Sequence, residues 1–271
     1  MNQQITSVII IGAMKCGTSA LYEHLTKHPE ICGGKLKEPE YFSLQMGDSK
    51  NKQGRYYDLF NIDDNQHRFI LDGSTGYTKY PHEKGVPDRI KAYGLNPYFI
   101  YIIRNPLERI RSHYNFMMKN INWDRDIDSP NLINTSKYFM QLQQYEKVFS
   151  RSRIIIVDFD RLKGNPAELC NEIFQFIGAK KVKITIDENA IKYKTPLVNK
   201  KYLFIKKKLI GIKFLFPSFL KSWLINMLNI LFPGKQEQLS EMQKIKIKKL
   251  LLEDISNLRD TYNFNVEKWG F

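Results

Sequence analysis

Residues 7–22 read SVIIIGAMKCGTSALY, and this stretch decides the fold class. Its first part, Val8 to Ile11, is apolar and β-branched, as a buried central strand of a parallel sheet requires. Gly12 and Gly17 then bracket a loop of small residues, and a helix is predicted to begin at Thr18. A glycine loop between a strand and a helix directs backbone N–H groups toward one point, at the positive end of the helix dipole. The stretch therefore predicts a phosphate-binding loop.

The position of the lysine in this loop narrows its function. The loop of nucleotide triphosphatases reads GxxxxGK[ST], with the lysine directly after the second glycine. Here Thr18 stands in that place, and the lysine is Lys15, two residues before Gly17. A lysine moved in this way sets its charge against a different part of the ligand, which argues against ATP or GTP hydrolysis. A P-loop kinase or NTPase is the alternative enzyme class, and a glycine turn without any ligand is the simplest alternative.

A second segment, residues 96–114, reads NPYFIYIIRNPLERIRSHY. It predicts a buried strand over residues 98–103 and a helix that starts at Pro106, because proline is tolerated in a first helical turn. Arg104 follows the strand, and Ser112 comes about two helical turns later. A guanidinium binds phosphate through two parallel N–H groups, and a hydroxyl adds one donor. The alternative for Arg104 is an ordinary surface ion pair.

Together these segments resemble the sulfotransferases, which take a sulfuryl group from 3′-phosphoadenosine 5′-phosphosulfate (PAPS). The pattern GxxKxGT[ST]xL is similar to their 5′-phosphosulfate loop, most of all in the carbohydrate branch, which includes the heparan sulfate sulfotransferases and bacterial relatives. The resemblance implies a P-loop-like α/β fold of three layers, with a central parallel sheet flanked by helices. It implies that Arg104 and Ser112 hold the 3′-phosphate of PAPS, and that no metal is required. The residues implied for the 5′ end of the donor are Lys15, Cys16, Gly17, Thr18 and Ser19.

The segment KEPEYF at residues 37–42 opens a loop over residues 35–60, which we call the acceptor-side loop. In the carbohydrate branch, a glutamate before a short run that ends in aromatic residues is the general base, and Glu38 stands in that place. A base is needed because a hydroxyl is a poor nucleophile until its proton is removed. Glu40 is the competing carboxylate and Asp72 is a further one, while a solvated loop acid is the alternative without chemistry.

Residues 71–77, LDGSTGY, depart from the pattern of the animal enzymes. Those enzymes carry EK[ST]PxY here, and their lysine acts at the reaction centre, but this chain has Gly73 in its place. Either Lys15 acts alone at the transferring group, or another cation such as Lys37 substitutes. Near the C-terminus the family closes over the nucleotide with the sequence KGR. The nearest counterpart here has a different order and no arginine, and it points to Lys235.

The length and the cysteine content of the chain indicate the number of domains and the redox environment. A chain of 271 residues suits one sulfotransferase domain over residues 1–271. The three cysteines, Cys16, Cys32 and Cys170, are widely spaced and are expected to be reduced thiols. In the phosphate loop the neighbours of Cys16 would lower the pKa of its thiol, although we interpret Cys16 first as a small residue that fills the loop. No signal peptide is visible, so a cytoplasmic enzyme of bacterial type is predicted.

The net charge of +14 is concentrated in one window, residues 189–236, which holds ten lysines and no Asp or Glu. This window is also apolar and is predicted to form a basic helical segment at about residues 200–235. Its longest uncharged run is shorter than the roughly 20 residues that cross a bilayer. We expect either docking of residues 201–232 on a membrane or polyanion, or an ordinary subdomain with solvated lysines. A basic binding module without enzyme activity is a further alternative, but the window lacks any nucleic-acid motif, so no nucleic-acid partner is predicted.

The predicted reaction is transfer of a sulfuryl group from PAPS to an acceptor hydroxyl, or less readily an amine. Glu38 removes the acceptor proton, and Lys15 with the loop N–H groups stabilises charge on the transferring group and the leaving phosphate. The acceptor is expected to be a carbohydrate or a glycolipid.

Overall fold

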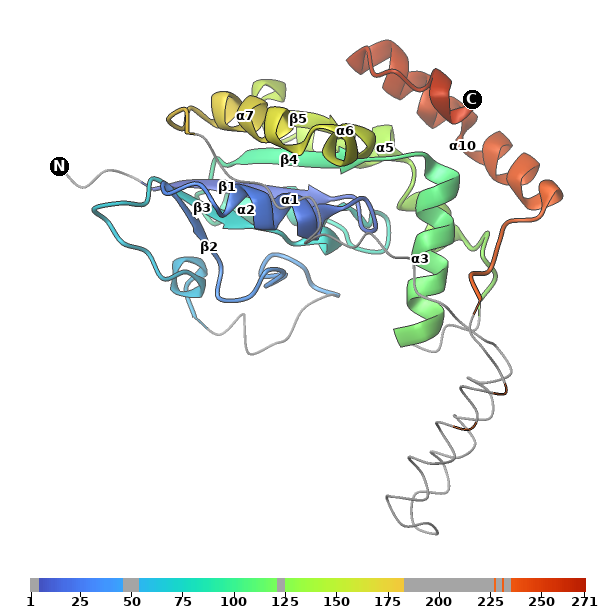
Figure 1. Cartoon of the computed structure of the whole chain (residues 1–271), viewed down its shortest axis with the longest axis horizontal. Coiled ribbons are helices and arrows are strands. Elements are labelled where there is room, and N and C mark those ends of the chain that lie inside the picture. The colour runs from blue at the N-terminus through green and yellow to red at the C-terminus, as the bar shows by residue number, and fades with distance from the viewer. Residues whose placement is uncertain (1–4, 46–53, 121–124, 183–226, 228–230, 232–234) are drawn as a thin grey trace, which may run out of the picture.

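Strand β1 (Thr6–Gly12) is the central strand of a five-stranded sheet with the order β2-β3-β1-β4-β5 (Figure 1). The computed structural model describes residues 5–45, 54–120, 125–182, 227, 231 and 235–271. All neighbouring strands of the sheet run parallel, and this confirms the predicted fold class. The other strands are β2 (Ile31–Gly33), β3 (Phe69–Asp72), β4 (Tyr98–Ile103) and β5 (Ile154–Asp158).

Helices cover both faces of the sheet. The ring of Tyr98 in β4 contacts Phe176 of α7, while the ring of the next residue, Phe99, contacts Tyr145 of α5. Successive residues of a strand point to opposite faces, so α7 and α5 lie on opposite sides. Helix α1 packs beside α7, and α10 packs beside α5. The α-helices are α1 (Thr18–Leu25), α2 (Val86–Ala92), α3 (Pro106–Asn120), α4 (Pro130–Asn134), α5 (Tyr138–Glu146), α6 (Phe159–Gly164), α7 (Pro166–Ile177) and α10 (Glu241–Tyr262).

The core forms where the sequence is most apolar. Residues Val8 to Ile11 of β1 are at most 1% exposed, as are Phe99 to Ile103 of β4. Burying strands of this kind on both faces is what a parallel sheet with helices on each side demands. Short 3-10 helices complete the description: η2 (Tyr56–Leu59), η3 (Thr75–Thr78), η4 (Arg151–Arg153) and η5 (Glu267–Trp269).

The carboxyl ends of the three inner strands bring the predicted site together. The phosphate loop follows β1, Gly73 follows β3, and Arg104 follows β4. The chain leaves β1 toward β2 and β3 and later returns to the other side for β4. Ligands of open parallel sheets bind in the crevice that such a reversal leaves at the carboxyl ends. Helix α3 stands beyond the end of β4 on this side of the sheet (Figure 1).

The basic segment predicted at about residues 200–235 lies outside the described residues, apart from Met227, Leu231 and Lys235. The same holds for the proposed docking stretch, residues 201–232. A single domain over residues 1–271 therefore stays a prediction.

Candidate donor-binding and transfer site

The two glycines of the phosphate loop are required by close contacts. Gly12 has a φ of +147°, and a Cβ atom at this position would lie 2.1 Å from Thr78 Oγ1. That hydroxyl is fixed, because it donates to the Ile11 carbonyl oxygen at 2.7 Å. Gly17 has a φ of +84°, and a Cβ atom there would lie 2.7 Å from the Phe159 ring. Only glycine fits both backbone conformations in this space, which explains the spacing read from the sequence.

Helix α1 presents its N-terminus at the loop. It begins at Thr18, and no side chain in the described part of the chain caps it. The first N–H groups of a helix have no partner within the helix, so they form a ready anion site. Thr18 is buried and Ser19 is exposed at this end. The N–H group of Cys16 instead donates to the Ala13 carbonyl oxygen at 3.1 Å within the loop.

The Cys16 side chain is buried inside the loop, in surroundings that disfavour its thiolate. Its thiol is fully buried, and burial raises its pKa to about 11, although the charges of Arg109 and Arg104 oppose this shift. The expectation that the loop lowers the pKa of this thiol is therefore wrong, because desolvation outweighs the nearby cations. The interpretation of Cys16 as a small filling residue agrees with its burial.

Lys15 lies inside the loop with a φ of +70°, a conformation that costs free energy for any residue other than glycine. Its Nζ lies 4.5 Å from the centroid of the Phe116 ring. Burial lowers the pKa of Lys15, the Glu38 carboxylate raises it, and the Arg104 and Lys37 cations lower it. The charge of Lys15 therefore interacts with that of Glu38, the predicted base, and with that of Arg104, which is predicted to bind the 3′-phosphate.

Arg104 meets the loop from the end of β4. Its Nη1 donates to the Lys15 carbonyl oxygen at 3.4 Å, and its guanidinium carbon lies 4.7 Å from the centroid of the Phe159 ring. Its Nη2 pairs with Glu108, one turn into α3. Lys15 and Arg104 therefore lie at one edge of the sheet.

Ser112 and Lys235 belong to two segments that meet along α3. Ser112 is buried on this helix. One turn further on, Asn115 Oδ1 accepts from the Glu237 N–H at 2.9 Å. Lys235 is exposed two residues before Glu237. The chain near Lys235 thus runs beside the helix that carries Ser112.

Arg109 is a buried cation behind the phosphate loop that the sequence interpretation missed. Its guanidinium is fully buried, and burial lowers its pKa. It donates to Ser136 Oγ at 2.5 Å, to the Met14 carbonyl oxygen at 3.4 Å and to the Leu132 carbonyl oxygen. His113 Nδ1 lies 3.0 Å away, and burial followed by the Arg109 charge holds the pKa of His113 well below its usual value. The described residues give Arg109 no carboxylate partner, so it leaves net positive charge behind the loop.

Glu38 is placed by the turn that follows β3. Thr75 Oγ1 donates to Glu38 Oε2 at 3.1 Å, and Lys37 Nζ pairs with the other carboxylate oxygen. The Glu38 side chain is 39% exposed, so an acceptor can approach it from solvent. The Gly73 N–H donates to the Lys37 carbonyl oxygen at 3.0 Å and fastens the acceptor-side loop to the sheet.

Glu40 lies beneath this surface. It is 5% exposed, has a φ of +51°, and accepts from the Gly76 N–H at 2.7 Å through Oε1. Its own N–H donates to Ser74 Oγ, which in turn donates to Asp72 Oδ1 at 2.5 Å. Burial raises the pKa of Glu40 to about 7 and that of Asp72 to about 6. The two competing carboxylates thus form a buried layer under the loop, while Glu38 alone of the three is open to an acceptor.

A model of the sulfotransferase domain family matches residues 6–204. The chain belongs to this family. The match spans the phosphate loop, the acceptor-side loop and the Arg104 segment, and it confirms the predicted family.

Several named sulfotransferases are similar to this chain in sequence or in fold. The membrane-associated sulfotransferase kil1 of Dictyostelium discoideum is 29% identical over 128 residues, which are 47% of this chain and 26% of that protein. The human heparan sulfate glucosamine 3-O-sulfotransferase 3B1 is 26% identical over 199 residues, 67% of this chain and 48% of that protein. The chain therefore spans between about a quarter and a half of the length of these relatives. A sulfotransferase crystal structure from Alicyclobacillus acidocaldarius is similar in fold, with a TM-score of 0.66 and 17% identity over 99% of this chain and 100% of that one.

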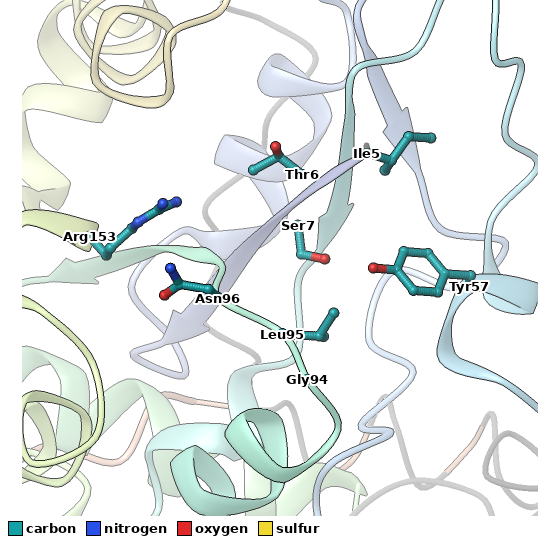
Figure 2. Close-up of a pocket in the computed structure, with 8 residues that line it drawn as sticks. All are labelled: Ile5, Thr6, Ser7, Tyr57, Gly94, Leu95, Asn96 and Arg153. Atoms are coloured by element: carbon teal, nitrogen blue, oxygen red, sulfur yellow. The ribbon is translucent and has the colours of Figure 1, made fainter. Parts of the chain in front are cut away.

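A separate cavity of about 280 Å³ opens at the opposite edge of the sulfotransferase sheet (Figure 2). Thr6 begins β1, Asn96 comes just before β4, and Arg153 comes just before β5, so the cavity lies at the amino ends of the strands. In Figure 2 the hydroxyls of Ser7 and Tyr57 point into the same hollow. The phosphate loop and Arg104 are at the carboxyl ends, so this cavity is separate from the predicted donor site.

Across the described ranges, no group of three or more His, Cys, Asp or Glu side chains is placed to hold a metal ion. Within the same part of the chain, no helix combines the length and the apolar character needed to cross a bilayer.

Proposed function

We propose that this protein transfers a sulfuryl group from PAPS to a hydroxyl of a carbohydrate or glycolipid acceptor. One observation carries the proposal: the phosphate loop after β1 and Arg104 after β4 meet, with Arg104 Nη1 donating to the Lys15 carbonyl oxygen at 3.4 Å. A nucleotide that bears anionic groups at both its 5′ and 3′ ends fits two adjacent cationic sites of this kind. A nucleoside triphosphate carries all its phosphates at the 5′ end, so it has no anionic group to place at the second site, Arg104.

Each end of the donor has its own ligands. The N–H groups at the start of α1 and the Lys15 ammonium take the 5′-phosphosulfate, with Gly17, Thr18 and Ser19 forming the loop and Cys16 shaping it. Arg104 and Ser112 take the 3′-phosphate, and Lys235 closes over the nucleotide. Arg109 adds positive charge from behind through its bond to the Met14 carbonyl oxygen.

The transfer step needs one base and one set of cations. The acceptor oxygen attacks sulfur, and the bond between sulfur and the bridging oxygen of the 5′-phosphate breaks. The electron pair of that bond leaves with adenosine 3′,5′-bisphosphate (PAP), and the acceptor proton passes to the Glu38 carboxylate. Lys15 stabilises the charge that develops on the sulfuryl oxygens and on the leaving phosphate, as cations do in phosphoryl transfer.

The acceptor class is supported by the relatives and by Glu38. A relative named as a heparan sulfate glucosamine 3-O-sulfotransferase aligns with 67% of this chain. Transfer of labelled sulfate from PAPS to heparosan tests the class. N-acetylated heparosan should be labelled as well as its de-acetylated form, because the proposed nucleophile is a hydroxyl. Labelling of the free amine alone would contradict this choice.

The donor is tested by thermal denaturation of the full chain with PAP, 5′-AMP and Mg-ATP. At about 100 times its Kd, PAP should add about 2.7 kcal/mol, or roughly 5–10 °C in Tm. Arg104→Ala should weaken PAP binding about 10–100-fold and leave 5′-AMP binding unchanged, because only PAP carries the 3′-phosphate. Arg161→Ala, which removes an exposed arginine paired with Glu172, is the matched control and should change neither. Stabilisation by Mg-ATP without PAP would favour the kinase or NTPase alternative.

We propose further that the protein contacts a membrane peripherally through residues 201–232, and that it acts in the cytoplasm. Helix α10, which follows this stretch in the chain, would add to the contact, since Met242, Ile245 and Leu252 are exposed on one side of it with Lys249 between them. The relative named as membrane-associated adds further support. Sedimentation with phosphatidylglycerol vesicles should show binding at low salt that is lost at high salt. Equal binding to neutral phosphatidylcholine vesicles, or none to either, would contradict the proposal.

A further inference from the structure

The space around Gly73 shows what stands where the animal enzymes carry their lysine. A Cβ atom at position 73 would lie 3.0 Å from the Lys37 carbonyl oxygen, 3.0 Å from the Tyr22 ring and 3.3 Å from Lys37 Cγ. The backbone of Lys37 is also fixed there, because its carbonyl oxygen accepts from the Gly73 N–H at 3.0 Å. The side chain of Lys37 therefore takes up room that a side chain at position 73 would need.

The Lys37 ammonium contacts the residue proposed as the base. It pairs with Glu38 Oε1, while Thr75 holds Glu38 Oε2 at 3.1 Å. The Lys37 side chain is only 24% exposed, which is unusual for a lysine on a loop. Its charge also reaches the phosphate loop, since it is one of the causes that lower the pKa of Lys15. Lys37 thus contacts the proposed base directly, and its charge also acts on the lysine of the phosphate loop.

We propose that Lys37 is the second catalytic cation, supplied from the acceptor-side loop in place of the lysine missing at position 73. This inference rests on the proposed sulfuryl transfer. Glu38 holds the ammonium before the donor binds, and the ammonium contacts the oxygens of the sulfuryl group in bound PAPS and throughout transfer. A preorganised cation at this point binds the charge that the sulfuryl group already carries, and it stabilises the further charge that develops as the bond to the leaving phosphate breaks.

Lys79 is the rival cation. It follows η3, half-buried, and burial lowers the pKa of its ammonium. Among nearby carboxylates Glu40 raises that pKa most, ahead of Glu38. Lys79 is therefore associated first with the buried carboxylate layer, whereas Lys37 directly contacts the residue proposed as base.

The test compares binding of PAPS and PAP, which differ only in the sulfuryl group, by isothermal titration to the full chain. Lys37→Met should weaken PAPS about 10-fold and change PAP less than 2-fold, because charged hydrogen bonds contribute at this level. Lys37→Arg should keep most of the PAPS affinity. Lys35→Met is the matched control, since Lys35 is an exposed lysine of the same loop whose Nζ donates to the Asp58 carbonyl oxygen at 2.8 Å, and it should change neither ligand.

Turnover gives a second readout. Release of PAP from PAPS, with water or heparosan as acceptor, should fall about 100-fold in Lys37→Met, mainly in kcat. The inference is overturned if Lys37→Met weakens PAPS and PAP equally, if it weakens neither, or if the PAPS-specific loss appears in Lys79→Met instead. If the unmodified protein binds neither ligand, the proposed function fails first and this inference fails with it.

Discussion

The phosphate loop and the acceptor-side loop meet at one edge of the sheet, but they are built differently. The phosphate loop is shaped by its backbone, with Ala13 and Cys16 buried and two glycines that leave no room for a side chain. The acceptor-side loop presents charged side chains, Lys37 and Glu38, that are partly exposed. At the two glycines of the phosphate loop no other residue fits without moving the backbone. In the acceptor-side loop the side chains of Lys37 and Glu38 can be replaced by others.

The difference between the two loops indicates which substitutions can change acceptor specificity. In the proposed function, the nucleotide is held by backbone N–H groups and the partly buried Arg104, so replacing exposed residues should leave its position unchanged. The proposed acceptor instead meets the Glu38 and Lys37 side chains, above a buried layer formed by Glu40 and Asp72. We therefore expect substitutions on the acceptor side to alter rate and acceptor choice, and substitutions of the two phosphate-loop glycines to disrupt the fold of the site itself.

The largest effect is expected from breaking the phosphate loop with Gly12→Ala. The new Cβ atom would lie 2.1 Å from Thr78 Oγ1 at a φ of +147°, so the loop must move. We expect a loss of about 2–4 kcal/mol in the free energy of unfolding and loss of stabilisation by PAP. Gly164→Ala is the control, because no atom lies within 4 Å of its Cβ position. Thermal denaturation that gives the two variants the same Tm would refute the contact argument.

Glu38→Gln should break the acceptor side and leave the donor side intact. The amide cannot take a proton, so transfer to heparosan should fall about 100-fold or more, since general bases contribute at least this much. Stabilisation by PAP should remain, because Glu38 contacts Lys37 and Thr75 rather than the phosphate loop. Glu172→Gln, an exposed glutamate paired with Arg161, should keep full activity. Full activity in Glu38→Gln would transfer the role of base to another group.

Glu40→Gln should change how the stability of the folded protein depends on pH, because Glu40 belongs to the buried carboxylate layer. Burial raises the pKa of Glu40 from its usual value of 4.5 to about 7, so the folded protein binds this proton more tightly than the unfolded chain. Its contribution to stability is therefore complete below pH 4.5 and is lost as the pH rises through 7. At about 1.4 kcal/mol per pKa unit the loss is at most roughly 3 kcal/mol.

The glutamine side chain is neutral at every pH and keeps an oxygen for the Gly76 N–H. The Tm of Glu40→Gln relative to the unmodified protein should therefore rise between pH 5 and pH 8. Comparing the two proteins at each pH removes the parallel contribution of Asp72, whose pKa is raised to about 6. A Tm difference that does not change with pH would mean that Glu40 is ionised in the folded protein throughout this range.

The smallest effect on turnover is expected for substitution of Cys16. This residue lies in the phosphate loop, but we expect its side chain only to fill space there. With its thiol buried and its pKa raised to about 11, the native protein should react with iodoacetamide at pH 8 far more slowly than the unfolded chain. Cys16→Ser should keep PAPS turnover within about 2-fold, because no step uses the thiol. A turnover loss much larger than the loss of stability would assign Cys16 a chemical role.

Much of the donor side was predictable because its signals are local. The strand predicted over residues 98–103 is β4 with the same bounds, and the helix predicted to start at Pro106 is α3. Strand β2, with only three residues, carries too short a pattern to be recognised in the sequence. Arg109 was passed over because an arginine in an amphipathic helix usually faces solvent, and only its contacts with Met14 and Leu132 place it inside.

Residues close together in the chain were enough to predict the parallel α/β fold and the glycine loop between β1 and α1, whereas the joint role of Arg104 and Ser112 at one phosphate stays a prediction. The packing of the folded chain exposes Glu38 while it buries Glu40 and Asp72, and it places the Lys37 side chain in the room beside Gly73. Those two outcomes depend on packing between the acceptor-side loop and the end of β3, which are separated by more than 30 residues. Burial, and not residue type, separates Glu38 from Glu40, and burial is a property of the folded chain.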